Sequence, residues 1–222
     1  ANNRRARVQP GVRNLAISEA AAEFGLYYAP DPSSQIACSI GGNVAENAGG
    51  VHCLKYGLTV HNIAQLEIVT MDGELISLGG AGLDAPGYDL LALFTGSEGL
   101  LGIIVEISVK LLPKPYACQV VLAAFDQVEK AGAAVAAIIG AGFLPAGLEM
   151  MDNFAIKAAE DFVHAGYPTA AAAILLCEVD GDVQDLRQQI HKIQNLMQSF
   201  GAYQVRASQD EAQRLLFWAG RK

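Results

Sequence analysis

A regular alternation of strand-like and helix-like segments fills the second half of the chain, beyond two prolines at Pro113 and Pro115. Short apolar runs bounded by turn residues favour strands, and longer runs with a helical period favour helices. The expected strands are Cys118–Ala124, Leu144–Met150, Ala170–Val179 and Tyr203–Ala207, and the expected helices are Asp126–Ala141, Asp152–Val163, Asp182–Phe200 and Asp210–Ala219. Elements in this order are typical of an α+β domain of the ferredoxin-like type.

The first half of the chain contains a β-hairpin signal and several glycine-rich loops. The pair Asp72-Gly73 strongly favours a tight turn, and it separates the expected strands Leu66–Met71 and Glu74–Leu78. Other expected elements are a helix capped by Asn14 or Ser18, a helix over Asp89–Phe94 and a strand over Gly102–Leu112. We therefore place a domain boundary near Leu112–Tyr116 and predict two domains, over residues 1–115 and 116–222.

Charge, hydropathy and cysteine usage exclude several classes of protein. The 15 Lys and Arg against 23 Asp and Glu give a net charge of −8, so the chain lacks the basic surface that nucleic-acid binding needs. Its apolar runs are shorter than the roughly 18 residues of a membrane-spanning helix, so we expect no membrane span. The four cysteines form no Cys-x-x-Cys pair, and the four histidines show no metal-ligand spacing. We therefore expect no metal site and reduced thiols in a cytosolic protein.

The segment Ser39–Gly50 is the first candidate binding site. The pairs Gly41-Gly42 and Gly49-Gly50 bracket a short stretch that can be helical. Glycines admit positive φ angles and bring bare N–H groups to a surface, and N–H groups at a helix start suit a diphosphate. The pattern is neither Gly-x-Gly-x-x-Gly nor a Walker A motif. From spacing alone, a pair of tight turns is an equally good interpretation.

The segment Gly96–Val105 is the second candidate. Gly96, Gly99 and Gly102 precede a β-branched strand, whose first residues could lay their backbone along a flat ring. An ordinary turn that enters a sheet is the alternative, and by itself it is the better interpretation.

With these segments, the sequence resembles the D-lactate and D-2-hydroxyglutarate dehydrogenase family of vanillyl-alcohol-oxidase-like flavoproteins, which includes the FAD-binding subunits of glycolate oxidases. The matching segments are Val8–Val12, Tyr28–Ser34, Ile40–Asn47, Gly49–Gly57, Asp84–Leu90, Gly96–Gly99, Leu148–Asp152 and Trp218–Lys222. The chain departs from the family at Leu100, where a threonine is usual. The resemblance implies the second part of a PCMH-type FAD-binding domain, followed by a truncated ferredoxin-like substrate domain.

The resemblance also implies a non-covalent FAD and a set of residues around it. Those implied to line the cofactor are Ser39, Gly41, Gly42, Asn43, Gly49 and Gly50, with Pro30, Asp31, Tyr56 and Gly57 nearby. Glu98, Gly102, Ile103 and Ile104 would contact the adenosine and the flavin ring through their backbone. Arg221 is implied to bind the substrate carboxylate. A further diphosphate-binding loop would precede Ala1, and histidine and acidic active-site residues would follow Lys222.

The implied activity is FAD-dependent oxidation of a small 2-hydroxy acid, of the glycolate or D-lactate class, to the 2-keto acid. Electrons would pass to a partner protein or a quinone, with companion flavin and iron–sulfur subunits as candidate partners. The location would be cytoplasmic, with membrane association through partner subunits as a further option. Three alternatives stay open: a D-2-hydroxyglutarate dehydrogenase, a non-catalytic flavin-binding or interaction module, and a covalent flavoprotein linked through His52 or His61.

Overall fold

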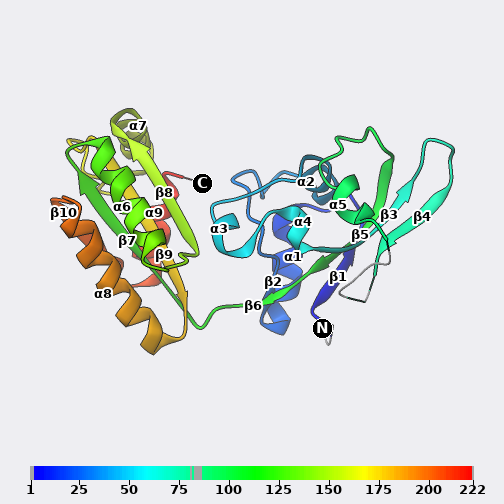
Figure 1. Ribbon diagram of the computed structural model, residues 1–222, viewed down its shortest axis with the longest axis horizontal. Helices are drawn as coiled ribbons and strands as arrows, with labels where there is room; N and C mark the ends of the chain where they lie inside the picture. Colours follow the sequence, from blue (N-terminus) through cyan, green and yellow to red (C-terminus); the bar gives the residue numbers. More distant parts are fainter. Residues whose placement is uncertain (1–2, 81, 83–86, 222) are drawn as a thin grey trace. The chain divides into compact units, whose positions relative to one another are not determined.

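The computed structural model describes residues 3–80, 82 and 87–221, which form two compact units, Ala1–Lys114 and Pro115–Lys222 (Figure 1). Residues 84–86 of the matching segment Asp84–Leu90 lie outside the described residues, as does Lys222 at the end of the last one. Each unit is an α+β structure with its own four-stranded antiparallel sheet. The expected mixture of helices and sheets is therefore confirmed.

The sheet of the first unit has the strand order β1-β5-β3-β4. Its strands are β1 (Arg5–Val8), β5 (Ile103–Lys110), β3 (Ile63–Val69) and β4 (Leu75–Gly79). The predicted hairpin is confirmed, because Val69 pairs with Leu75 and the turn between them places Gly73 at a φ of 81°. That angle favours glycine, since a side chain there would be strained.

Short helices and a two-stranded sheet pack around this sheet. They are α1 (Asn14–Ala21), the 3₁₀ turn η1 (Ala22–Phe24), α2 (Ile40–Glu46), α3 (Cys53–Tyr56), α4 (Thr59–Asn62) and α5 (Leu90–Phe94), with β2 (Leu26–Tyr27) paired to β6 (Leu112–Pro113). Ile17 of α1 and Ile40 and Val44 of α2 enter the core formed by the strands. This packing fixes the start of α2, which carries one of the glycine pairs.

The predicted cap of α1 was wrong. Arg13 occupies the N-cap position, and Asn14 is the first, buried residue of the helix. The Asn14 amide donates to the Pro30 carbonyl at 2.9 Å, and the Ser18 hydroxyl exchanges hydrogen bonds with the backbone of Tyr28. Both polar side chains hold the Tyr28–Pro30 loop against the helix, which local sequence could not reveal.

The second unit contains all eight predicted elements. They are β7 (Ala117–Phe125), α6 (Val128–Gly140), β8 (Gly147–Asp152), α7 (Asn153–Val163), β9 (Ala173–Gly181), α8 (Val183–Ser199), β10 (Gln204–Ala207) and α9 (Glu211–Ala219). The sheet order β10-β7-β9-β8 places the first and third strands of the unit at its centre. This is the ferredoxin-like arrangement, with α7 as an additional helix between the second and third strands.

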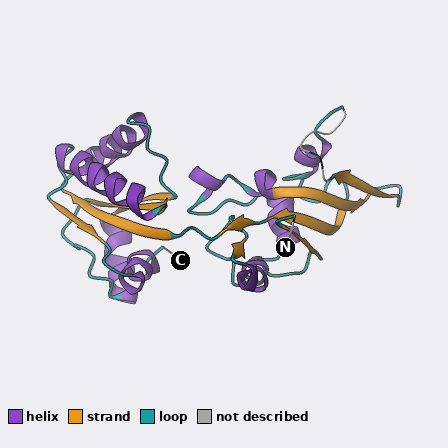
Figure 2. Ribbon diagram, turned by 90° about the horizontal axis from the view of Figure 1, so that it is seen from below, coloured by secondary structure: helices purple, strands orange, loops and turns teal. Residues whose placement is uncertain are grey.

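Helices cover both faces of this sheet (Figure 2). Ile138 of α6 and Ile193 of α8 share a core with alternate residues of β7 and β9. Most of the remaining residues of these strands are also buried, and α7 and α9, whose Ile156, Phe217 and Trp218 are buried, pack against the sheet. The end of α9, which leads to Arg221, is therefore anchored on a rigid sheet.

Candidate functional site

The first unit contains a cavity of about 390 Å³ whose lining is rich in glycine. Its lining residues are Pro10, Gly11, Ser39, Gly41, Gly42, Ala45, Gly99, Gly102, Ile103 and Ile104. The start of α2 and the start of β5 meet there, and both were predicted from sequence to contact a cofactor. The volume lies within the range of about 300–1,000 Å³ that is typical of small-molecule sites.

The start of α2 exposes backbone to this cavity. The Ser39 hydroxyl accepts a hydrogen bond from the Gly42 N–H at 3.2 Å and so caps the helix. A Cβ at Gly41 would lie 2.5 Å from the Cβ of Pro10, so packing within the protein already requires glycine there. A Cβ at Gly42 would meet, among the described residues, only the Ser39 hydroxyl at 3.1 Å. At Gly42, in contrast to Gly41, the described neighbour is the end of one small side chain and not the backbone.

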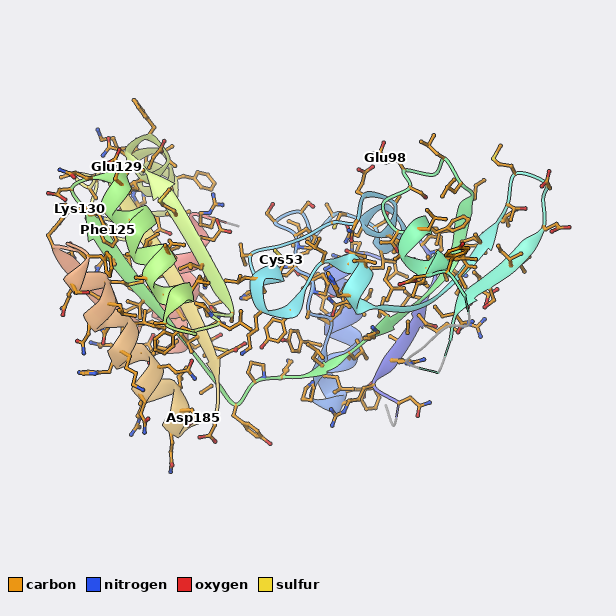
Figure 3. All side chains as sticks on the ribbon, in the orientation of Figure 1. Cys53, Glu98, Phe125, Glu129, Lys130 and Asp185 are labelled. Atoms are coloured by element: carbon orange, nitrogen blue, oxygen red, sulfur yellow. The ribbon has the colours of Figure 1, made fainter. Side chains whose placement is uncertain are left out.

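The loop before β5 closes the cavity from the other side. Gly99 has a φ of 77°, and a Cβ there would have no described atom within 4 Å. A Cβ at Gly102 would lie 2.8 Å from the Val69 carbonyl oxygen. Glu98 is exposed on this loop (Figure 3), and its N–H donates to the Ala45 carbonyl at 3.0 Å. The loop is thus tied to α2 by its backbone, while the Glu98 side chain is not among the residues that line the cavity.

A second group of predicted residues lies on the loops around Asp31. His52 Nδ1 and Asp31 Oδ2 are 2.7 Å apart, and the two side chains are 17% and 12% exposed. A Cβ at Gly50 would lie 2.6 Å from the Asp31 backbone carbon, so the two loops are in close contact. The other carboxylate oxygen, Asp31 Oδ1, is buried and lacks a hydrogen-bond partner among the described residues. A buried acceptor of this kind suits a ligand donor.

Asn43 connects α2 to the Pro30 loop. Its side-chain amide donates to Asn14 Oδ1 at 2.8 Å, and the Asn14 amide donates to the Pro30 carbonyl at 2.9 Å. Asn43 is only 5% exposed, so its amide contributes by fixing the positions of α2 and the loop. The predicted role of Asn43 as a cofactor contact stays a prediction.

Tyr56 and Gly57 lie at the end of α3. The ring of Tyr56 packs edge-on against Tyr27, with centroids 6.3 Å apart. Gly57 has a φ of 79°, and a Cβ there would lie 2.8 Å from Nδ1 of His61. His61 in turn accepts a hydrogen bond from the Leu58 N–H at 3.0 Å, which gives this histidine a structural role.

Arg221 lies in the turn that follows α9, and its guanidinium contacts Glu149 of β8. Nε and Nη2 lie 3.1 and 2.5 Å from the same carboxylate oxygen, Oε2. Tyr167 fixes this turn, because its hydroxyl donates to the Phe217 carbonyl at 2.7 Å and accepts from the Gly220 N–H at 3.2 Å. Burial raises the pKa of Tyr167, which keeps the donating hydroxyl protonated.

A buried carboxylate anchors α9 itself. Glu178 Oε2 accepts hydrogen bonds from Trp218 Nε1 at 2.6 Å and from Arg214 Nη1 at 2.9 Å. Hydrogen bonding to Glu211, together with the charge of Glu178, raises the pKa of Arg214. The guanidinium therefore keeps its charge next to the buried carboxylate. Two independent contacts, one at Trp218 and one at Tyr167, thus fix the helix end that carries Arg221.

Within the part of the chain that the structure describes, no group of three or more His, Cys, Asp and Glu side chains is placed to hold a metal ion. Among the same residues, no helix is long and apolar enough to cross a membrane.

Residues 1–79 match the family of FAD binding domains, and residues 114–222 match the C-terminal domain of FAD linked oxidases. The chain therefore belongs to the FAD-linked oxidases, and the expected family and fold are confirmed. FAD is the cofactor of this family, as the sequence predicts.

Three relatives in this family match nearly the whole of this chain. It is 66% identical over 219 residues to "Glycolate oxidase subunit GlcD" of Escherichia coli, a match that covers 99% of the chain and 44% of that protein. It is 42% identical to the protein of the same name from Bacillus subtilis, over 94% of the chain and 45% of that protein. It is also 32% identical to a D-lactate dehydrogenase of Anaerostipes hadrus, over 97% of the chain and 47% of that protein. The chain thus spans less than half the length of each of these relatives.

Among solved structures, alkyldihydroxyacetonephosphate synthase has a similar fold. The TM-score is 0.77 at 18% sequence identity, and the match covers 99% of this chain and 43% of that one. At this identity the likeness concerns the fold alone.

Sequence reasoning did not assign a cofactor contact to four of the residues that line the cavity. They are Pro10, Gly11, Ala45 and Gly99. Each lies in a segment that carries the family resemblance, Val8–Val12, Ile40–Asn47 or Gly96–Gly99, so the signal was present. What the sequence lacked was the folding of these three segments around one cavity.

Proposed function

We propose that this chain is part of an FAD-dependent enzyme that oxidises a small 2-hydroxy acid, such as glycolate or D-lactate, to the 2-keto acid. The observation that carries the proposal is the glycine-lined cavity between α2 and β5, in a domain that matches the FAD binding family. The 66% identity to a glycolate oxidase subunit supports the substrate class.

The first unit holds the cofactor in this proposal. Gly42 and Gly99 offer backbone without a side chain, and Ile103 and Ile104 offer an apolar strand start. FAD binds there non-covalently and, when bound, supplies the two-electron acceptor for the oxidation. Because the cavity is one part of a dinucleotide site, other parts of the protein contribute the remaining contacts.

Arg221 of the second unit binds the substrate carboxylate. A guanidinium offers parallel N–H donors that match the two oxygens of a carboxylate, and so it fixes the orientation of a small hydroxy acid. The contacts of Tyr167 and Trp218 place this side chain on a rigid support, which favours accurate positioning. The base that accepts the hydroxyl proton is assigned to residues beyond this chain.

Electrons leave through a partner protein or a quinone, and companion flavin and iron–sulfur subunits are the proposed partners. The word "subunit" in the name of the E. coli relative supports an assembly. We propose a cytoplasmic location for the assembly.

The test uses the intact protein, purified and precipitated with acid. We expect FAD in the supernatant, and reduction of an artificial electron acceptor with glycolate or D-lactate as the donor. Flavin retained in the pellet would contradict non-covalent binding. A flavin-free protein would contradict the proposal as a whole, and so would a flavoprotein that oxidises neither acid.

A further inference from the structure

The guanidinium of Arg221, which we propose binds the substrate carboxylate, already contacts a carboxylate of the protein, that of Glu149. Glu149 and Arg221 are 72 positions apart in the sequence, and their side chains are 24% and 36% exposed. Both are thus open enough for a small solute to reach them. The contact lies on β8 and on the turn after α9, outside the hydrophobic core.

The geometry of this ion pair leaves room for a better partner. Both Arg221 contacts converge on Oε2 of Glu149, so the carboxylate uses one oxygen where the guanidinium could bind two. A free carboxylate can present both oxygens to parallel N–H groups, which is the stronger arrangement. A partly exposed ion pair is weak, so a bound ligand can readily replace it.

The turn that carries Arg221 does not depend on Glu149. Tyr167 binds the backbone of Phe217 and Gly220, and a Cβ at Gly220 would lie 2.8 Å from the Tyr167 ring. Trp218 is bound to Glu178. Release of Glu149 would therefore leave the backbone of this turn in place and free only the guanidinium.

We propose that Glu149 is a resident carboxylate that competes with the substrate for Arg221 and is released when the substrate binds. This inference rests on the proposed function of Arg221. It makes Glu149 a specificity-determining residue, because its negative charge stays on β8 next to the occupied site. A second carboxylate on the substrate is then repelled, which favours glycolate and D-lactate over D-2-hydroxyglutarate.

The variant Glu149→Gln removes the charge and keeps the size of the side chain. We expect KM for glycolate to fall by about 1.4- to fivefold, which corresponds to the roughly 0.2–1 kcal/mol of a partly exposed ion pair, with kcat changed less than twofold. The inhibition constant of acetate, which has no hydroxyl to oxidise, falls by the same factor. The preference for glycolate over D-2-hydroxyglutarate, as a ratio of kcat/KM values, becomes smaller. Glu129→Gln is the matched control, because it removes an equal charge from an exposed position on α6 (Figure 3).

A structural role for Glu149 predicts the opposite sign. If the ion pair mainly orients Arg221 for the substrate, Glu149→Gln raises KM, and the inference is overturned while the proposed function stands. Arg221→Ala tests the proposed function separately: an unchanged KM in that variant removes the substrate role of Arg221, whatever Glu149 does. A flavin-independent measurement is acetate titration of the 222-residue chain, followed by the NMR signal of Arg221 Nε–H. Tighter acetate binding in Glu149→Gln than in Glu129→Gln supports the competition, and equal binding contradicts it.

Discussion

An added side chain should mainly lower stability at Gly41 and mainly abolish FAD binding at the adjacent Gly42. At Gly41 a Cβ would lie 2.5 Å from the Pro10 Cβ and 3.0 Å from its carbonyl oxygen, so the backbone must move. Overpacking of this kind costs about 1–3 kcal/mol of unfolding free energy. At Gly42 the described neighbour is the Ser39 hydroxyl at 3.1 Å, and valine is no worse than glycine in a helix. We therefore expect Gly42→Val to change the unfolding free energy by less than about 1 kcal/mol, and Gly41→Ala to lower it more.

FAD retention should be lost more completely in Gly42→Val than in Gly41→Ala, which is the reverse of the order expected for stability. The valine methyl groups at Gly42 would point into the cavity where backbone meets the cofactor, so Gly42→Val should abolish FAD retention in a folded protein. The assay combines circular dichroism melting with quantification of acid-released flavin in the intact protein. Gly41→Ala controls for a general loss of stability. A folded Gly42→Val variant with wild-type flavin content would refute the assignment of this cavity, and equal destabilisation by both substitutions would refute the packing argument.

Four further predictions concern the cofactor, the substrate and the thiols. The isolated 222-residue chain should bind FAD weakly or not at all, as measured by fluorescence quenching. The family resemblance implies a further diphosphate-binding loop, and each charge-assisted hydrogen bond that such a loop would make contributes about 1.5–3 kcal/mol. Sub-micromolar binding by the isolated chain would contradict this prediction. Arg221→Lys should raise KM at least about tenfold with normal FAD content, because lysine keeps the positive charge but lacks the parallel N–H donors of a guanidinium. Wild-type kinetics in both Arg221→Lys and Arg221→Ala would show that Arg221 only caps the helix end. Burial raises the pKa of Cys118 and Cys177 to about 12. Both thiols should therefore react more slowly with a disulfide reagent at pH 8 than Cys38 and Cys53 do. Equal reaction rates at all four thiols would contradict this prediction. The same shifts predict that the contribution of these two thiols to the free energy of unfolding is constant below about pH 8 and falls as the pH rises through 9 towards 12, because only the unfolded thiols ionise in that window, which a pH series of denaturant titrations would show.

Three of the four helix starts in the second unit could be predicted because their cause is local, whereas the helix expected from Asp126 begins at Val128 without a side-chain cap. Asp152, Asp182 and Asp210 each begin an expected helix, and each side chain accepts a hydrogen bond from a backbone N–H two or three residues later. Such a contact is encoded within four residues of sequence. The capping roles expected of Asn14 and Ser18 failed for the opposite reason, since their partners belong to a loop 10 to 16 residues away.

The segments that line the cavity could be predicted from the sequence, but the roles of their individual residues could not. The glycine-rich segments indicated that the backbone is closely approached there, but they did not indicate whether by a ligand or by another part of the protein. At Gly41, Gly50 and Gly102 the structure supplies a partner within the protein, from Pro10, Asp31 and Val69 respectively. At Gly42 the described neighbour is only the Ser39 hydroxyl, and at Gly99 the space is open. This distinction depends on atoms that are 19 to 33 positions away in the sequence, so a single sequence cannot make it. The same holds for Glu149 and Arg221, which only the packing of α9 against the sheet brings together.

The start of β5 contains an irregularity that regular strand alternation does not anticipate. Simple alternation along the expected strand would place Ile103 on the same face as the buried residues Ile107 and Val109. The register against β3 shifts between Glu67 and Ile68, however, so that buried Ile68 pairs with Ile104 and the core face passes to Ile104. A bulge of this kind turns the neighbouring side chain to the other face, and bulges are common beside functional sites. Ile103 is 67% exposed as a result and lines the cavity next to Gly99 and Gly102. An exposed aliphatic side chain beside bare backbone is a surface that a flat ring can cover, which agrees with a flavin at this position.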